Sequence, residues 1–397
     1  MKSYQTISSF TLFVLFTSVI NAQESKTIIR GKVHKWPSDT IYIQTLPFHS
    51  PYSSQLKHIL ISKDSTFSYE FTKKNMPIVF HLSPNKGLMI VNSKKLLFEN
   101  LTEEHYWGFC NKFYDYGLST HLIENGKSIR VDLTYNNRRQ KLTAKQEKTA
   151  KKYGLKVAPD HTLSVNQKTE IKHFGLNKFQ YDYYQKSFTL DDKLDKRLEV
   201  YESKSILEAV ISLKKLTHQM LRKLEKEKRK LSPLFYNYIK AEIVFGAKKE
   251  FLKFLRFAKE KELNALFSKA IPKEILDVVE FDKSDINNAT LISEEYNEYL
   301  ELYLNFKMNV INKKYVVYNK FSKQKIKKAI KILPKKSVYY YLVNHLLHYS
   351  NNNLIKHLKK ESDTDSNEDL IEELVAGILK RYPKGELNNL LMKKFNF

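Results

Sequence analysis

Cysteine is nearly absent from this chain of 397 residues, which contains Cys110 alone. One thiol cannot close an internal disulfide, and dithiol exchange needs a second thiol to resolve the mixed disulfide. Four aromatic residues lie close to it in the sequence: Trp107, Phe109, Phe113 and Tyr114. We therefore expect Cys110 to be a small buried apolar side chain, with a mixed disulfide to another protein as the alternative.

Glycine and proline are scarce, at 10 residues each, which disfavours a disordered or fibrous protein. A hydrophobic content of 42% over this length is enough for one large core or two ordinary ones. Beyond the N-terminal region no segment stays apolar for the roughly 20 residues that cross a bilayer. We therefore expect no transmembrane segment in the mature chain.

Motifs with recognisable chemistry are also missing. The sequence has no Gly-x-Ser-x-Gly and no glycine-rich phosphate loop. His345 and His348 share a helical spacing that suits zinc, with His357 further on, but no third ligand follows at a familiar distance. The acidic stretch from Glu361 to Asp369 lacks the glycine and the final glutamate of a calcium loop. We expect no catalytic residue, no metal and no cofactor.

Positive charge is what the chain has in excess, with 68 Lys and Arg against 43 Asp and Glu, a net charge of +25. The two signs alternate in stretches such as Lys223–Lys230, which is typical of solvated helix faces. We expect no nucleic acid as a partner. The expected partner is an unknown envelope protein or an anionic polymer, and Arg138–Lys152 is the most basic candidate segment for such binding.

The N-terminus has the order of a secretory signal peptide. Lys2 supplies the positive charge, Phe10–Ile20 is apolar, and Ala22 is a small residue after which cleavage is expected. The apolar run is too short to span a bilayer. The sequence therefore predicts a signal peptide at 1–22 and secretion across the inner membrane, to the periplasm or cell envelope.

Residues 23–176 carry the strand signals. Short alternating β-branched segments are separated by turn-forming residues, which favours an antiparallel β-sandwich. Lys63-Asp64-Ser65 and Asn125-Gly126 each predict a hairpin between the strands that flank them. A basic insertion near 136–169 begins as an expected loop or surface helix, and one further strand returns to the sandwich within 160–175.

Residues 177–397 have helical periodicity and predict a mostly α-helical domain. The first clear helix, Ser205–Leu224, has its apolar stripe at Ile206, Val210, Leu213, Thr217, Met220 and Leu224. Ser232 and Pro233 open a long helix over 233–267, with a break expected near Gly246. Ser293 precedes another helix, and further helices are expected at 322–333, 338–349 and 367–381. Ser366 or Asn367 is the expected cap of the last.

The order of parts resembles envelope proteins of the TlpA/ResA-like thioredoxin group. The similar stretches are TIIRGKVHKWPSDTIYIQTL (27–46), LIENGKSIRVDL (122–133), EIKHFGLNKFQYDYY (170–184), LSPLFYNYIKAEIVFGAKKEFL (231–252), LISEEYNEYLELYL (291–304) and LKRYPKGELNNLL (379–391). The resemblance implies an N-terminal β-sandwich and a helical connector that precede a thioredoxin domain. The Trp-Cys-x-x-Cys motif of that domain is absent here, so no catalytic residue carries over, and the sequence does not tell whether another chain supplies the domain.

The sequence thus predicts an α+β, non-catalytic exported envelope protein with a binding or scaffolding role. Two alternatives remain. Cys110 would make the chain an accessory of a thiol-disulfide oxidoreductase system through a mixed disulfide. The basic segments would instead make it a binder of anionic envelope surfaces.

Overall fold

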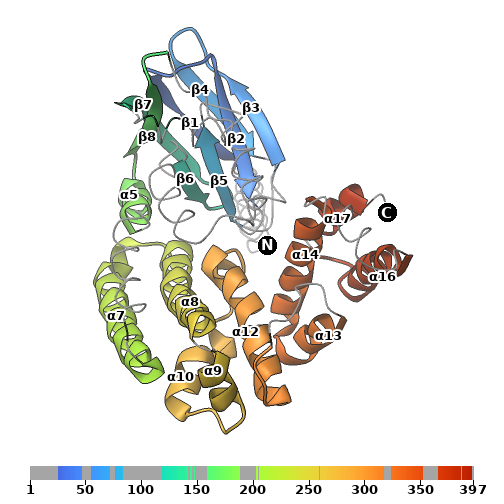
Figure 1. Cartoon of the computed structure of the whole chain (residues 1–397). Helices are drawn as coiled ribbons and strands as arrows, with labels where there is room; N and C mark the ends of the chain where they lie inside the picture. Colours follow the sequence, from blue (N-terminus) through green and yellow to red (C-terminus); the bar gives the residue numbers. More distant parts are fainter. Residues whose placement is uncertain are drawn as a thin grey trace, which may run out of the picture.

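The structure is a computed structural model that describes residues 26–46, 55–71, 77–83, 119–141, 159–187, 205–258, 260–316, 323–351, 365–385 and 387–395, with the single residues 144, 147 and 203. It shows a mixed α+β protein. Figure 1 shows β-strands at one end of the molecule, with helices below and beside them. The expected order of a β-rich part followed by a helical part is confirmed.

The first sheet is mixed. Its four strands, in spatial order, are β4 (Thr66–Phe71), β1 (Thr27–His34), β7 (Ser128–Lys141) and β8 (Thr162–Phe174). The β1 and β7 strands run parallel, so the expectation of a wholly antiparallel fold is wrong here. Gly31 makes this pair possible, because a Cβ at Gly31 would lie 1.5 Å from the Val131 carbonyl oxygen.

The second sheet is antiparallel throughout. Its strands lie in the order β3 (Gln55–Leu60), β2 (Thr40–Leu46), β5 (Ile78–Ser83) and β6 (Ser119–Ile123). Side chains of the two sheets touch. The Phe71 ring of β4 is 4.9 Å from the Phe80 ring of β5, and the His121 ring of β6 is 5.7 Å from the His173 ring of β8.

Both predicted hairpins are wrong, although both turns exist. Asn125-Gly126 joins β6 to β7, and residues 61–65 join β3 to β4, but each turn connects strands of different sheets. Gly126 has a φ of 72°, and its N–H donates to the Thr27 hydroxyl at 2.7 Å. The turn chemistry was therefore predicted correctly, while the pairing partners are set by contacts distant in sequence.

The basic segment after Asn136 differs from expectation at its start. The β7 strand continues through 136–141, where a loop or surface helix was predicted. It pairs with β8, the return strand that the sequence did predict, with a register irregularity between Asn136 and Arg138. Most of 142–158 lies outside the described residues. Within that stretch, the Glu147 carboxylate accepts a hydrogen bond from the exposed His161 ring, with Oε2 2.8 Å from Nδ1.

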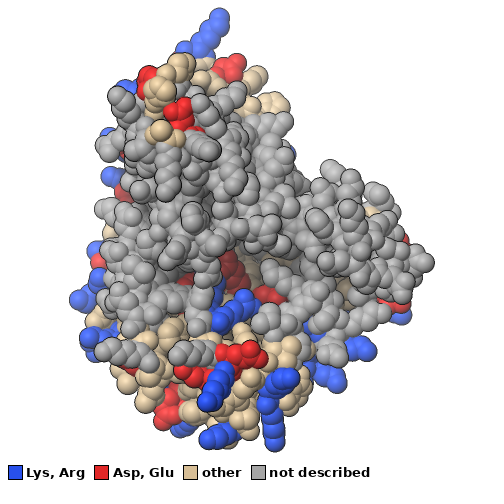
Figure 2. Space-filling view, viewed as in Figure 1, with Lys and Arg blue, Asp and Glu red and all other residues tan. Residues whose placement is uncertain are grey.

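The helical part begins with α5 and contains these elements: α5 (Lys178–Ser187), α7 (Ile206–Glu227), η3 (Lys228–Lys230), α8 (Pro233–Phe257), α9 (Glu260–Phe267), α10 (Lys273–Val279), η4 (Lys283–Asp285), α11 (Asn288–Leu291), α12 (Glu294–Asn312), α13 (Lys323–Ile332), α14 (Lys335–Asn351), α16 (Asp365–Arg381) and α17 (Asn388–Phe395). Figure 2 shows basic and acidic side chains mixed over the described surface of these helices, as the alternating charges predicted.

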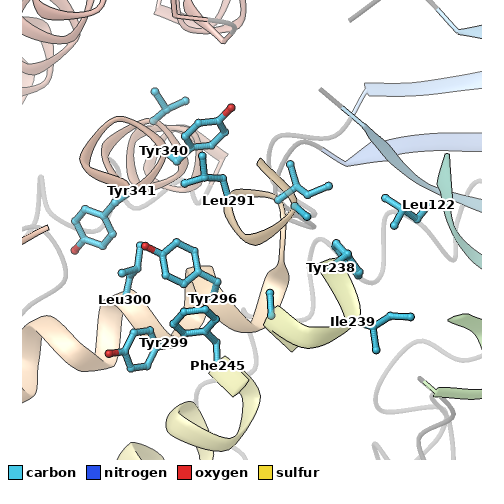
Figure 3. Close-up of a cluster of buried hydrophobic side chains, with 14 of the residues drawn as sticks. Leu122, Tyr238, Ile239, Phe245, Leu291, Tyr296, Tyr299, Leu300, Tyr340 and Tyr341 are labelled. Carbon is cyan, nitrogen blue, oxygen red and sulfur yellow. The ribbon is translucent and has the colours of Figure 1, made fainter. Parts of the chain in front are cut away.

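Aromatic residues of α8, α12 and α14 form the helical core, and Figure 3 shows Phe245, Tyr296 and Tyr299 packed together. The Phe245 ring lies 4.6 Å from Tyr296 and 5.2 Å from Tyr299. The three are almost completely buried. The buried hydroxyls have partners: Tyr296 with Ser337 Oγ at 2.6 Å, and Tyr299 with the Val279 carbonyl at 2.6 Å. Such pairing removes the cost of burying a phenol.

The predicted helix starts agree with the structure better than the predicted helix break and the predicted cap of the last helix. Ser232 and Ser293 cap α8 and α12, accepting from the N–H groups of Phe235 at 3.3 Å and Tyr296 at 3.2 Å. The predicted break near Gly246 is wrong, since α8 continues through it and ends at Phe257. Glycine at this position leaves room for Glu295 of α12, because a Cβ there would lie 3.3 Å from its carboxyl carbon. Ser366 and Asn367 lie inside α16 rather than at its cap.

The α5 helix starts at the predicted boundary near residue 177 and packs on both parts of the molecule. The Tyr181 ring lies 5.4 Å from His173 of β8 and 5.3 Å from Phe235 of α8. Ser232 donates its hydroxyl hydrogen to Glu124, and its N–H to Gln180 Oε1 at 3.3 Å. The sheets and the helices are thus joined through a buried contact.

Candidate functional site

The strongest candidate site lies on the outer face of the mixed sheet. Alternation along β1 buries Ile29 and Val33 and exposes Arg30 between them. The register places Arg30 directly beside Arg130 of the parallel strand β7. Neighbouring strands are ~4.8 Å apart, so the two arginine side chains leave the sheet from adjacent positions on one face.

A row of four residues crosses the sheet at this level. In order from β4 to β8 the row is Ser68, Arg30, Arg130 and Phe174. The Arg130 guanidinium lies 5.2 Å from the centre of the Phe174 ring, and the Lys172 ammonium lies 5.3 Å from it. The ring therefore makes cation–π contacts with two cations, one from β7 and one from its own strand.

A hollow of about 270 Å³ lies beside this row, and we call it the arginine groove. Its lining residues are Arg30, Ser128, Arg130, Phe174, Gly175, Leu176 and Asn177. Gly175 has a φ of 94°, a conformation that favours glycine, and it turns the chain from β8 toward α5. Leu176 is fully exposed at the rim.

In the neighbouring row of residues on the same face, positive and negative side chains lie next to each other. There Lys32 of β1 and Lys172 of β8 lie on either side of Asp132 of β7. In the part of the chain that the structure describes, no carboxylate pairs with Arg30 or Arg130. Like charges on adjacent strands cost about 0.2–1 kcal/mol. The arginine pair is therefore a cost to folding that an anionic ligand would remove.

A second candidate is the buried histidine of the α5 contact. His173 shares a hydrogen bond between its Nδ1 and Asp182 Oδ1 at 2.9 Å, and it is 1% exposed. Its Nε2 has no hydrogen-bond partner among the residues that the structure describes. Burial lowers the pKa of His173, against the opposing effect of Asp182. No serine or cysteine is seen at the ring among the described hydrogen bonds, and the aromatic rings of His121 and Tyr181 enclose it.

Buried lysines of the helical part have structural partners. Lys249, 4% exposed, pairs with Glu295 and with Glu298 at 3.1 Å. Burial lowers the pKa of Lys248 to about 8, and its ammonium donates to the Val278 and Glu280 carbonyls at 2.8 and 2.5 Å. These carbonyls end α10, so Lys248 caps that helix. Such groups join helices rather than line an open site.

The residues that the sequence singled out are not brought together. Cys110, His357 and the predicted signal peptide at 1–22 lie outside the described residues. His345 and His348 lie on α14, and Arg138 opens the last part of β7, but their side chains are not described. The described residues contain no cluster of three or more potential metal-ligating side chains. Within the same residues, no helix has the length and hydropathy to cross a membrane.

Sequence analysis missed the arginine groove. Arg30 and Arg130 are 100 positions apart, and each is a single arginine in an alternating strand. A signal was present, because both occupy exposed positions of strands that the sequence predicted. The parallel pairing that brings them together was not predictable from local pattern.

Comparisons with protein-family models, with curated proteins and with solved structures found no match to this chain. The resemblance to the TlpA/ResA-like group therefore stays a prediction.

Proposed function

We propose that this chain is an exported, non-catalytic envelope protein that binds an anionic ligand in the arginine groove. The observation that carries the proposal is the in-register pair Arg30 and Arg130, with no carboxylate partner among the described residues. Proteins place like charges side by side at a cost in stability, and binding of an anion is the function that such a pair performs. The overall charge of +25 would draw anions toward the site.

The rest of the molecule supplies a rigid support for that site. We further propose that the two sheets stack as a β-sandwich, supported by the ring contacts between Phe71 and Phe80 and between His121 and His173. The helical part then corresponds to the connector of the TlpA/ResA-like proteins that the sequence resembles. Export is supported by the signal-peptide pattern at 1–22.

The proposal is tested by cosedimentation of the purified chain with isolated cell envelopes at about 0.15 M salt. We expect the wild type to sediment with the envelopes and the double variant Arg30→Ala/Arg130→Ala to remain in solution. The control is Arg222→Ala/Lys223→Ala, which removes the same two positive charges from exposed positions of α7. Equal sedimentation of the double variant and the control would show that general positive charge, not the groove, is responsible.

A further inference from the structure

We infer that the arginine groove recognises a phosphate monoester group. This inference rests on the proposed function and specifies its ligand. The observations that carry it are the number of guanidinium groups, the neutral donors beside them and the size of the hollow.

Charge favours a dianion over a carboxylate. A phosphate monoester carries a charge of about −1.5 to −2 at neutral pH. Arg30 and Arg130 both line the hollow, and neither has a carboxylate partner in the described chain. A carboxylate has one negative charge and one pair of oxygens, which a single arginine fork satisfies. It would leave the second guanidinium without an ionic partner.

Shape favours the same group. A phosphoryl group has three terminal oxygens arranged in a tetrahedron, so it can accept from two arginine forks that approach from adjacent strands. Lys172, in the neighbouring row beside Asp132, contacts the same Phe174 ring as Arg130 but does not line the hollow. Ser128 and Asn177 also line the hollow, and both residue types carry neutral hydrogen-bond donors.

The volume limits the ligand to a head group. The hollow of about 270 Å³ lies below the ~300–1,000 Å³ range of sites for drug-sized molecules. A phosphate with a short alcohol or sugar fits this space, whereas an extended polymer would lie mostly outside. The first turn of α5, directly after the lining residue Asn177, contains no acidic residue that would repel the group.

The test is isothermal titration of the full chain with glycerol phosphate and with galacturonate, at equal ionic strength. We expect glycerol phosphate to bind at least about tenfold more tightly than galacturonate. Arg30→Ala and Arg130→Ala should each raise the Kd for glycerol phosphate by about tenfold or more. The control Arg222→Ala should bind glycerol phosphate as the wild type does. Far-UV circular dichroism confirms that each variant is folded.

Two results separate the inference from the function on which it rests. Equal or tighter binding of galacturonate, with loss in both groove variants, would overturn the phosphate inference and leave anion binding at the groove intact. Binding of neither anion would overturn both.

A second arm identifies the source of the phosphate group. Flotation with phosphatidylcholine vesicles containing phosphatidic acid, compared with vesicles of phosphatidylcholine alone, tests a lipid head group. Arginine-dependent flotation together with glycerol phosphate binding supports a lipid source. Glycerol phosphate binding without flotation supports a soluble phosphate ester. Flotation that persists in Arg30→Ala would show that the rest of the basic surface is responsible, and it would count against the groove.

Discussion

At the scale of single residues, Gly31 is the position where the fold leaves the least room. A Cβ there would lie 1.5 Å from a backbone oxygen of the neighbouring strand, and a backbone cannot move aside as a flexible side chain can. We expect Gly31→Ala to lower the free energy of unfolding by about 3 kcal/mol or more. Denaturant unfolding of purified protein measures this change.

The matched control is Gly377→Ala in α16, where a new Cβ meets nothing within 4 Å. Alanine is the better helix former, so this variant should gain up to about 1 kcal/mol. Equal effects of the two substitutions would contradict the close approach of β1 to β7.

At the scale of elements, Ser232 does more than cap its own helix. Its hydroxyl also donates to Glu124 next to β6, so loss of the side chain affects the contact between sheets and helices. We expect Ser232→Ala to cost about 2 kcal/mol, against about 1 kcal/mol for Ser205→Ala, an exposed cap of α7. Denaturant unfolding of the two variants and the wild type measures both costs. A smaller cost at Ser232 than at Ser205 would contradict a stabilising role for the hydrogen bond from Ser232 to Glu124.

The β8–α5 contact should also weaken in acid. Because the pKa of His173 is lowered in the folded state, the unfolded chain binds more protons between that pKa and the ordinary value of about 6.5. The contribution of His173 to the free energy of unfolding is therefore fully present above about pH 6.5, and it falls as the pH drops from there toward the lowered pKa. The charged or titratable groups facing His173 are Asp182 and Lys178 of α5, His121 of β6, and Tyr181 of α5.

We expect His173→Asn, which keeps a donor for Asp182 but does not titrate, to lose part of this pH dependence. Unfolding curves at about pH 7.5 and pH 5.5 give the difference. His161→Asn, at an exposed histidine, serves as the control. An unchanged pH dependence in His173→Asn would assign the acid sensitivity to other groups.

These elements also show how far the sequence leads. Ser232-Pro233 and Ser293 predicted helix starts correctly because a cap is a local hydrogen bond between neighbouring residues. The predicted helix break at Gly246 was wrong. Glycine at this position accommodates Glu295 from another helix, and such a tertiary contact has no local signal in the sequence. The arginine groove could not be predicted for the same reason, since the parallel pairing of two strands distant in sequence creates it.

At the scale of the whole molecule, the sequence suggested two separate parts, and the structure joins them through α5. His173, Tyr181 and Phe235 form a continuous series of ring contacts from β8 to α8. We therefore expect the sheets and helices to unfold together. Both tryptophans, Trp36 and Trp107, precede the helical part, so their fluorescence reports on the N-terminal part, and circular dichroism at about 222 nm reports mainly on the helices.

The two signals should change at the same denaturant concentration in the wild type and at different concentrations in Tyr181→Ala, which removes the central ring. Phe179→Ala, an exposed aromatic residue of the same helix, should leave them coincident. Separate transitions in the wild type would mean that the two parts fold independently.

The parallel pairing of β1 with β7 has a consequence for synthesis. When β1 leaves the ribosome, the strand that will lie beside it is still about 100 residues from being made, and such distant pairings form slowly. The Arg30–Arg130 pair cannot exist before that moment, so the arginine groove is one of the later features to form as the chain is made.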